Sequence, residues 1–227
     1  MESKKGYYSE KLSAHRLRRC YEIASPRVQR YLRAEIEYVM KKIQPGDNVL
    51  EPGCGYGRVL EFLCSKAHDV YGIDNSISSL KLAKETLRDI SNCHLCLMDA
   101  VALGFRNDFF DSVLCIQNGI SALGVDPHDF ISEFVRVCRP GGTVMLSSYS
   151  DKFWPDRLNW FNRQIQEGLL GEIDFDKTGN GVIVCKDGFK ATTVSPDDFL
   201  SLVSQLGLSA DIVEVDNSSV FCEILVE

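Results

Sequence analysis

Three carboxylates and a set of glycines are the residues of this 227-residue chain whose types and spacing favour ligand chemistry. The carboxylates are Glu51, Asp74 and Asp99, and the glycines are Gly53, Gly55 and Gly57. Glycines let the backbone turn sharply and approach a ligand closely, and a helix that follows offers unpaired N–H groups. A carboxylate accepts hydrogen bonds from sugar hydroxyls or an amine, and it pairs with a cation. The pattern therefore predicts a site for a nucleoside-like ligand.

The glycine spacing distinguishes two kinds of nucleotide site. The dinucleotide fingerprint is G-x-G-x-x-G, and its third glycine would fall at Arg58 in this chain. The observed spacing is G-x-G-x-G, and Glu51 stands two residues before the first glycine. A carboxylate there opposes a pyrophosphate but suits a cationic group. An NAD-dependent oxidoreductase is thus an alternative that Arg58 and Glu51 both disfavour.

The elements that must position these residues alternate along the chain. Apolar runs predict strands at 48–53, 69–74, 93–100, 110–119 and 142–150, with helices at 57–67, 76–90 and 126–139 between them. Such alternation predicts a parallel sheet with right-handed crossovers. Glu51, Asp74 and Asp99 come near the carboxyl ends of three strands, at the edge where open α/β sheets bind ligands.

The flanking segments follow other patterns. Helical spacing at 10–24 and 27–43 predicts that residues 1–44 form an N-terminal helical segment or lid. The main domain is expected over 45–227, with an insert at 151–194 that contains an aromatic-rich helix and antiparallel strands around a turn at Gly179–Gly181. A helix at 195–207 and two strands joined at 216–219 complete the chain.

Composition argues against several classes of protein. No apolar run approaches the roughly 18 residues that a membrane span needs, and the first 20 residues lack a secretory pattern, so we expect a cytoplasmic protein without a membrane partner. The net charge is -7. Residues 1–42 hold 11 Lys+Arg and 5 Asp+Glu, which is +6, so the remainder carries -13. An acidic body argues against a DNA partner.

The nine cysteines are scattered and odd in number. This indicates reduced core thiols rather than a disulfide framework. The tightest pair, Cys93 and Cys96, has no second pair at metal-site spacing, so no metal site is predicted.

Five ordered segments resemble the successive motifs of class I S-adenosylmethionine-dependent methyltransferases. They are "VLEPGCGYGRVLEF", "VYGIDNS", "LMDAVALGF", "FDSVLCIQNGI" and "RVCRPGGTVML", within residues 45–150. The resemblance implies a doubly wound, Rossmann-like α/β fold. Its sheet would have seven mostly parallel strands in the order 3-2-1-4-5-7-6, and "SSVFCEILVE" would be the antiparallel seventh strand.

The resemblance also implies which residues hold S-adenosylmethionine, whose product is S-adenosylhomocysteine. The glycine loop and Glu51 would lie against the methionine part, Asp74 would hold the ribose hydroxyls, and Asp99 would meet the adenine amine. Neighbouring positions complete the set: Asn75 beside Asp74, the Ala100 backbone beside the adenine ring, and Gln117 and Asn118 facing the methyl donor.

The implied activity is methyl transfer (EC 2.1.1.-) to a small-molecule acceptor. The fourth strand ends in "QNGI" and lacks the Asn/Asp-Pro-Pro-aromatic signature of enzymes that methylate base or amide nitrogens. The acceptor pocket is expected outside the sheet, with the candidates Tyr8, Arg19, Tyr21 and Trp154. His15 and His128 are the candidates for a general base, which only a protonated, weakly acidic acceptor would need.

Two further functions remain open from the sequence. The basic N-terminal helices would be the docking surface of a protein or RNA methyltransferase. A non-catalytic subunit that binds the cofactor and a partner would keep the same glycine loop and carboxylates. The attacked atom and the oligomeric state do not follow from the residues.

Overall fold

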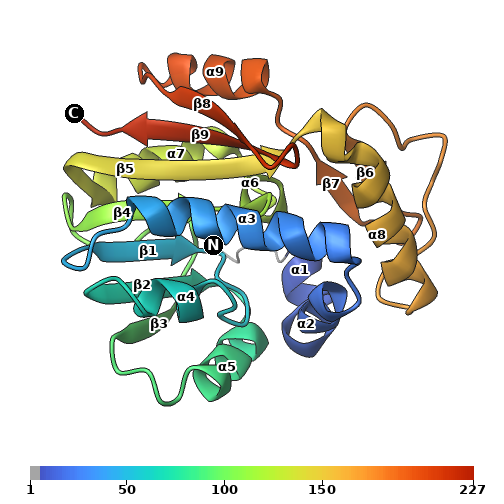
Figure 1. Ribbon diagram of the computed structural model, residues 1–227, viewed down its shortest axis with the longest axis horizontal. Helices are drawn as coiled ribbons and strands as arrows, with labels where there is room; N and C mark the ends of the chain where they lie inside the picture. The colour runs from blue at the N-terminus through green and yellow to red at the C-terminus, as the bar shows by residue number, and fades with distance from the viewer. Residues whose placement is uncertain (1–5) are drawn as a thin grey trace.

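A seven-stranded sheet forms the centre of the protein in a computed structural model that describes residues 6–227 (Figure 1). Its order is β3-β2-β1-β4-β5-β9-β8. The strands are β1 (Asn48–Pro52), β2 (Asp69–Asp74), β3 (Cys93–Leu97), β4 (Phe110–Cys115), β5 (Cys138–Tyr149), β8 (Asp211–Val215) and β9 (Ser219–Leu225). The first five pair in parallel, and β9 runs antiparallel to both β5 and β8. The predicted 3-2-1-4-5-7-6 order with an antiparallel seventh strand is confirmed.

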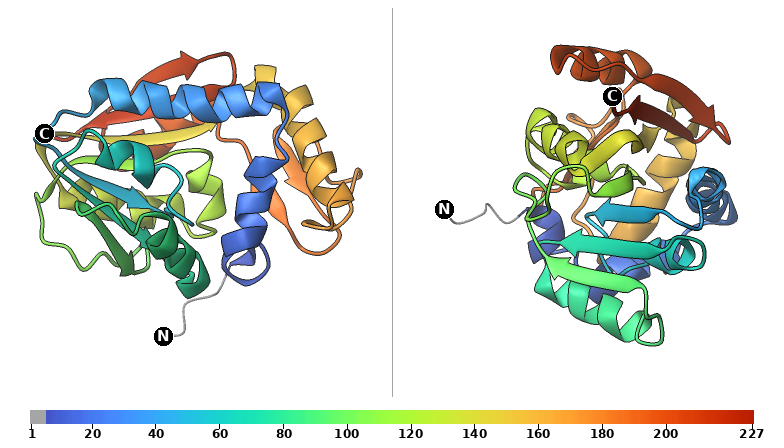
Figure 2. Two further views of the ribbon diagram at one scale, coloured as in Figure 1. Left: turned by 60° about the horizontal axis from the view of Figure 1, so that its bottom comes forward. Right: turned by 90° about the vertical axis from the view of Figure 1, so that its left-hand side faces the viewer.

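Helices cover both faces of this sheet (Figure 2). One face carries α3 (Pro26–Lys42), α4 (Leu60–Cys64) and α5 (Ile77–Thr86), and the other carries α7 (Pro127–Val137) and α9 (Pro196–Gln205). The remaining elements are α1 (Tyr7–Glu10), α2 (Ala14–Glu22), α6 (Gly119–Ala122), the 3-10 turn η1 (Asp151–Phe153), α8 (Trp154–Gln166), β6 (Val182–Val184) and β7 (Lys190–Thr192). Each face of the sheet therefore buries its own apolar core.

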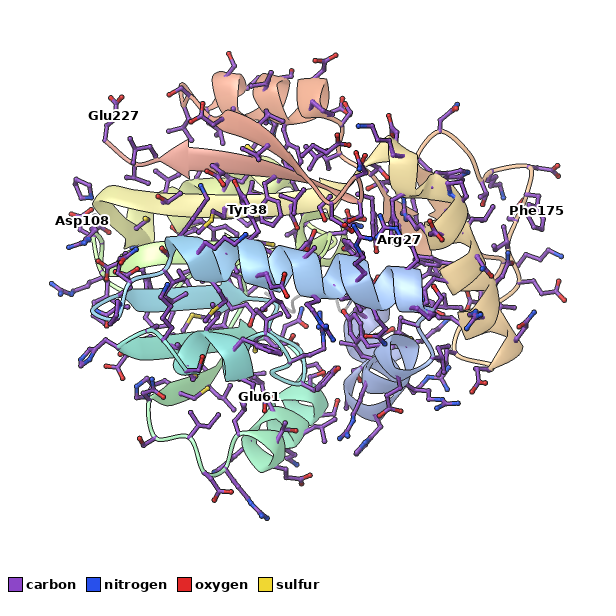
Figure 3. The ribbon with its side chains drawn as sticks, in the orientation of Figure 1. Arg27, Tyr38, Glu61, Asp108, Phe175 and Glu227 are labelled. Atoms are coloured by element: carbon purple, nitrogen blue, oxygen red, sulfur yellow. The ribbon has the colours of Figure 1, made fainter. Side chains whose placement is uncertain are left out.

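Helix α3 is fixed to the C-terminal strands. Ser25 caps its first turn by accepting a hydrogen bond from the Val28 N–H, and Pro26 takes the first helical position. The Tyr38 hydroxyl donates to Glu223 of β9 over 2.6 Å, and Arg27 contacts Asp216 of the β8–β9 turn over 2.7 Å. Figure 3 labels Tyr38 and Arg27 on this helix. These ties, with the buried apolar face, make α3 a fixed wall for whatever lies beside it.

The N-terminal helices and the insert pack together at one end of the sheet (Figure 1). Leu12 and Cys20 share an apolar cluster with Phe161 of α8 and with Ile183 and Phe189 of the β6–β7 hairpin. The two segments flanking the sheet domain therefore form one structure. The division into 1–44 and 45–227 stays a prediction, and its first five residues lie outside the described residues.

The local structure differs from the predictions at three places. The expected helix at 10–24 is shorter: α1 ends at Glu10, and α2 begins only at Ala14, whose φ of +50° separates it from the preceding turn, and ends at Glu22. The insert has the predicted turn at Gly179–Gly181, where Gly179 and Val182 exchange two backbone hydrogen bonds of 2.9 Å. It also has a second turn at Cys185–Phe189, which joins β6 to β7 and was not predicted. Helix α7 ends at Val137, and the following Pro-Gly-Gly belongs to β5.

Within residues 6–227, no helix combines the length and the apolar character that crossing a bilayer requires. The same residues contain no group of three His, Cys, Asp or Glu side chains arranged to hold a metal ion. All nine cysteines are free thiols, and six of them are buried.

Candidate functional site

A pocket lies at the carboxyl ends of β1, β2 and β4, and helices α2, α3 and α8 close its other side. It brings together eight of the ten residues predicted to bind the cofactor. They are Glu51, Gly53, Gly55, Asp74, Asn75, Asp99, Ala100 and Gln117. Residues up to 66 positions apart, from Glu51 to Gln117, thus share one cavity.

The glycine loop folds back over the end of β2. The N–H groups of Gly53 and Cys54 both donate to the Ile73 carbonyl, over 2.8 and 3.0 Å, and the Gly55 N–H donates to Asp74 Oδ2 over 2.9 Å. Gly55 has a φ of +56°, and a Cβ added there would lie 3.1 Å from Leu17 of α2. The loop therefore needs glycine both for its left-handed backbone and for the close approach of α2.

Gly57 and Asn118 are the two predicted residues that do not line the pocket. A Cβ at Gly57 would come within 2.7 Å of Leu87, so this glycine lets the segment after α5 pack close to the loop. Asn118 is buried, and its Oδ1 accepts a hydrogen bond from Ser148 of β5 over 2.8 Å. Both residues therefore support the pocket wall without lining the pocket.

Asp74 and Asp99 keep acceptor capacity for a ligand. Asp74 already accepts the Gly55 N–H and, over 2.7 Å at Oδ1, the Ser76 N–H. Burial raises the pKa of Asp74, and these two N–H donors oppose that rise. Asp99 accepts from the Val101 N–H over 3.2 Å. Since each carboxylate has about four lone-pair sites, both can take further donors from a sugar or a base.

Glu51 and Arg58 place an acidic and a basic side chain, each with buried polar atoms that have no partner, in the same pocket wall. Glu51 is 6 % exposed, and its Oε2 has no hydrogen-bond partner; burial raises its pKa to about 8, against the lowering effect of Arg58. Arg58 Nε and Nη2 are also buried without partners, and the guanidinium lies 4.6 Å from the centre of the Tyr21 ring. Buried charged groups without partners are costly unless a ligand satisfies them.

This pair fits the amino-acid end of S-adenosylmethionine. An ammonium group suits the free Glu51 oxygen, and a carboxylate suits the free Arg58 nitrogens. The sequence predicted no ligand contact for Arg58, which only breaks the dinucleotide fingerprint. The signal that points to its role is its position one residue after the last glycine of the loop.

The other half of the pocket is an aromatic chamber. We give this name to the wall formed by Tyr8, Tyr21, Tyr31, Tyr149, Trp160, Phe161 and Gln164. Tyr8 and Tyr21 were predicted to contact the acceptor, whereas Tyr31 and Tyr149 were not among the candidates. The charged side chains among the described lining residues are Glu51, Arg58, Asp74 and Asp99, so the aromatic chamber itself carries tyrosine hydroxyls and an amide but no carboxylate, lysine or arginine.

The remaining candidates lie outside this pocket. Arg19 is exposed and pairs with Glu167 over 2.7 Å, and Trp154 packs in the apolar cluster shared by α1, α2 and the insert. His15 is exposed. His128 contacts Asp126 and Gln205, each over 2.9 Å, and the hydrogen bond that the imidazole donates to the Asp126 carboxylate raises its pKa. Neither histidine is positioned to reach a ligand in the pocket.

Comparison with known proteins agrees with this architecture. A family model described as a methyltransferase domain matches residues 49–142. A 2-methyl-6-phytyl-1,4-hydroquinone methyltransferase of Synechocystis sp. is 26% identical over 65% of this chain and 49% of its own length. A demethylmenaquinone methyltransferase of Renibacterium salmoninarum is 32% identical over 47% of this chain and 43% of its own length. The chain therefore spans about half the length of the curated relatives it matches.

Solved structures share the fold. The crystal structure of a SAM-dependent methyltransferase of Methanosarcina mazei superimposes with a TM-score of 0.62 at 21% identity, covering 84% of this chain and 98% of that one. The sheet order, the glycine loop with its strand-end carboxylates, and the matched methyltransferase domain agree with one another. In its matched domain, its sheet order and the residues of its pocket, the chain is similar to class I S-adenosylmethionine-dependent methyltransferases.

Proposed function

We propose that this protein transfers the methyl group of S-adenosylmethionine to a small molecule held in the aromatic chamber. The observation that carries the proposal is the pair of unsatisfied groups on Glu51 and Arg58, in the same pocket as Asp74 and Asp99. When bound, S-adenosylmethionine supplies a methyl group already activated by its sulfonium. The protein then has to bind, orient and shield the reactants.

Each wall of the pocket has a separate task in this proposal. Glu51 and Arg58 hold the two charges of the amino-acid end, Asp74 takes the ribose hydroxyls, and Asp99 takes the adenine amine. Gln117, at the end of β4, borders the methyl donor. Helix α2 packs directly on the glycine loop, through Leu17, and so keeps water away from the methyl group.

The charge distribution favours a small acceptor over RNA. The basic side chains of the N-terminal helices are largely paired within the protein: Arg18 with Glu22, Arg19 with Glu167, Arg27 and Arg30 with Asp216, and Lys42 with Glu223. Paired arginines offer little to a phosphate backbone. The names of the two curated relatives also describe small acceptors, a phytyl hydroquinone and a demethylmenaquinone.

The test uses methyl-labelled S-adenosylmethionine. The protein is incubated with the labelled donor and a fractionated cell extract that is divided into small molecules, protein and RNA. We expect label in a product of the small-molecule fraction, and we expect Asp74→Ala to lose it while Arg19→Ala retains it.

Two outcomes would contradict the proposal. Label found only in protein or RNA would favour a macromolecular acceptor. Tight binding of S-adenosylhomocysteine without label in any fraction would favour a non-catalytic subunit.

A further inference from the structure

A buried arginine without an acidic partner lies behind the aromatic chamber. Arg157 of α8 is 1 % exposed. Its hydrogen-bond acceptors within residues 6–227 are all uncharged: Nη1 donates to the Gly181 carbonyl over 2.9 Å and to Thr193 Oγ1 over 2.6 Å, and Nη2 donates to the Ala191 carbonyl over 3.2 Å. Nε is buried without a partner. Because a guanidinium stays protonated in proteins, these residues leave a full positive charge buried without a counter-charge.

Two rings of the aromatic chamber are in contact with this guanidinium. The Arg157 Cζ atom lies 4.2 Å from the centre of the Tyr149 ring and 5.7 Å from the centre of the Phe161 ring, and both residues line the pocket. Burial raises the pKa of Tyr149 and of Tyr8, and the charge of Arg157 opposes both rises. Arg157 therefore acts on the chamber across the thickness of one aromatic side chain.

Gln164 supplies a hydrogen-bond donor in the same part of the chamber. Arg157, Phe161 and Gln164 follow one another along α8 at spacings of four and three residues, which places them on one helix face. Gln164 is buried and lines the pocket, and its side-chain amide has no hydrogen-bond partner in the described part of the chain. An amide N–H beside a positive charge suits a carboxylate.

The charges near the chamber favour a negative ligand. In the proposed function, Glu51 and Arg58 hold the amino-acid end of the cofactor, whose sulfonium adds a positive charge beside the chamber. Glu35, buried on α3 four residues after the lining residue Tyr31, has its pKa raised to about 7 by burial, so it is only partly ionised at neutral pH. A cationic acceptor would add to the charge of Arg157, whereas an anionic acceptor would balance it.

We propose that the aromatic chamber binds its methyl acceptor through a carboxylate, which takes the Gln164 amide as hydrogen-bond donor and the charge of Arg157 as counter-charge. This inference rests on the proposed methyl-transfer function and narrows the acceptor to an organic acid with a flat or apolar body, which the aromatic rings of the chamber enclose. Gln164 touches the ligand. Arg157 is a specificity-determining residue that acts through the Tyr149 ring.

A carboxylate fits this wall better than a phosphate does. The described lining residues of the chamber offer the Gln164 amide and tyrosine hydroxyls but no lysine or arginine, and Arg157 is not itself a lining residue. A phosphate has more oxygens to satisfy and is usually held by such cations or by a helix N-terminus.

A purely structural role for Arg157 makes a different prediction. Its hydrogen bonds to Gly181, Ala191 and Thr193 tie α8 to the β6–β7 hairpin beside it (Figure 1). Loss of these ties alone would weaken every ligand of the chamber alike. Loss of the charge would weaken an anion and spare a neutral ligand of the same shape. Ligands that are matched in shape and differ in charge therefore separate the two roles.

The probes are benzoate, benzamide and benzamidine, which share one shape and are negative, neutral and positive near neutral pH. Each is titrated into the protein saturated with S-adenosylhomocysteine, which in the proposed function occupies Arg58 and Asp74 and leaves the chamber open. Tryptophan fluorescence follows binding, since Trp160 lines the chamber. We expect benzoate to bind saturably and at least about tenfold more tightly than benzamide, as for a unit charge acting across one ring. Benzamidine should bind more weakly than benzamide.

Three variants test the roles of the two residues. Arg157→Gln should lower the affinity for benzoate to that for benzamide and leave the affinity for benzamide unchanged. Arg157→Lys, the matched control, keeps the charge and should keep the preference for benzoate. Gln164→Glu leaves the ties of Arg157 in place and should reverse the order, so that benzamidine binds more tightly than benzoate. The affinity for S-adenosylhomocysteine is measured first for each variant and should not change.

Five outcomes would overturn the inference. They are no saturable binding of benzoate, binding of benzamide or benzamidine as tight as that of benzoate, a preference for benzoate that survives in Arg157→Gln, equal losses of benzoate and benzamide in that variant, and an unchanged order in Gln164→Glu. Tighter binding of phenyl phosphate than of benzoate would replace the carboxylate by a phosphorylated acceptor and would equally overturn it. Failure of the proposed function would instead be seen as absent S-adenosylhomocysteine binding or absent methyl transfer from the labelled donor.

Discussion

The two halves of the pocket are built on opposite principles. The sheet edge carries four ionisable side chains, Glu51, Arg58, Asp74 and Asp99, and two of them keep buried atoms without partners. The aromatic chamber carries hydroxyls and rings but no charged side chain among its lining residues. A wall of ionisable groups with unpartnered hydrogen-bonding atoms binds a ligand of complementary charge tightly. An uncharged wall instead orients a ligand through its shape and weak hydrogen bonds. This difference supports the proposal that the sheet edge holds the cofactor and the aromatic chamber holds the acceptor.

The largest expected effect is at Asp74, because this carboxylate serves both the ligand and the loop. Asp74→Ala should lower the affinity for S-adenosylhomocysteine by about 100-fold or more and the free energy of unfolding by about 1–3 kcal/mol, since the Gly55 and Ser76 N–H groups lose their acceptor. Calorimetric titration and denaturant unfolding measure the two losses. Asp99→Ala, which leaves the loop intact, should lose about tenfold in affinity and little stability. Equal stability losses would contradict the double role of Asp74.

Substitution of Arg58 should give the next largest loss of cofactor affinity, and it tests the sheet-edge half of the pocket separately from the aromatic chamber. Arg58→Met should weaken S-adenosylhomocysteine binding by about 10- to 100-fold through the lost charged hydrogen bonds. The apo protein should lose little stability, because Nε and Nη2 have no partners and only the contact with the Tyr21 ring is removed. Tyr21→Phe, which keeps the ring under Arg58, is the matched control and should keep the affinity. Unchanged binding in Arg58→Met would show that another group holds the carboxylate.

Glu51 should couple cofactor binding to proton release. Its pKa is raised from 4.5 to about 8 in the apo protein, so it is mostly protonated at pH 7, and pairing with an ammonium favours the ionised form. The affinity for S-adenosylhomocysteine should therefore rise with pH up to about 8, by at most about tenfold per pH unit. Calorimetry in buffers of different ionisation enthalpy counts the released proton.

The raised pKa of Glu51 gives the stability of the apo protein the opposite dependence on pH. A raised pKa contributes stability that is present below 4.5 and is lost as pH rises to about 8. Glu51→Gln should flatten this loss and also abolish the proton release. A variant that releases the same proton as wild type would assign the release to another group.

The smallest effects are expected outside the pocket. Arg19→Ala breaks an exposed ion pair with Glu167, which contributes little to stability because solvent screens it, and His128→Asn alters a solvent-facing helix start. Both should leave methyl transfer and cofactor affinity within about twofold of wild type. A large loss of activity in Arg19→Ala would restore it as an acceptor-binding residue and would extend the site beyond the pocket.

The sheet-edge half could be predicted from the sequence because each of its residues is close in sequence to a strand end. Glu51, Asp74 and Asp99 follow apolar runs, and the parallel topology brings those ends together. The position of the Asn118 side chain could not be predicted in this way. Its backbone is at the expected place, but its side chain accepts a hydrogen bond from Ser148, a contact between the start of α6 and β5 that spacing along the chain does not reveal.

The aromatic chamber could be predicted only in part. Tyr8 and Tyr21 lie in a segment that was expected to cover the site, but Tyr31 looks like any apolar position of α3 in the helical pattern. Tyr149 ends a buried strand and gives no separate signal. Their convergence depends on how α3 and α8 pack against β5, which arises from tertiary contacts and not from local periodicity.

A crystal structure of the protein with S-adenosylhomocysteine tests the account most directly. We predict the ribose at Asp74, the amino-acid end between Glu51 and Arg58, and the sulfur directed toward Tyr31 and Gln117 at the mouth of the aromatic chamber. A ligand bound elsewhere, or a sulfur turned away from the chamber, would contradict the division of the pocket on which the proposed function depends.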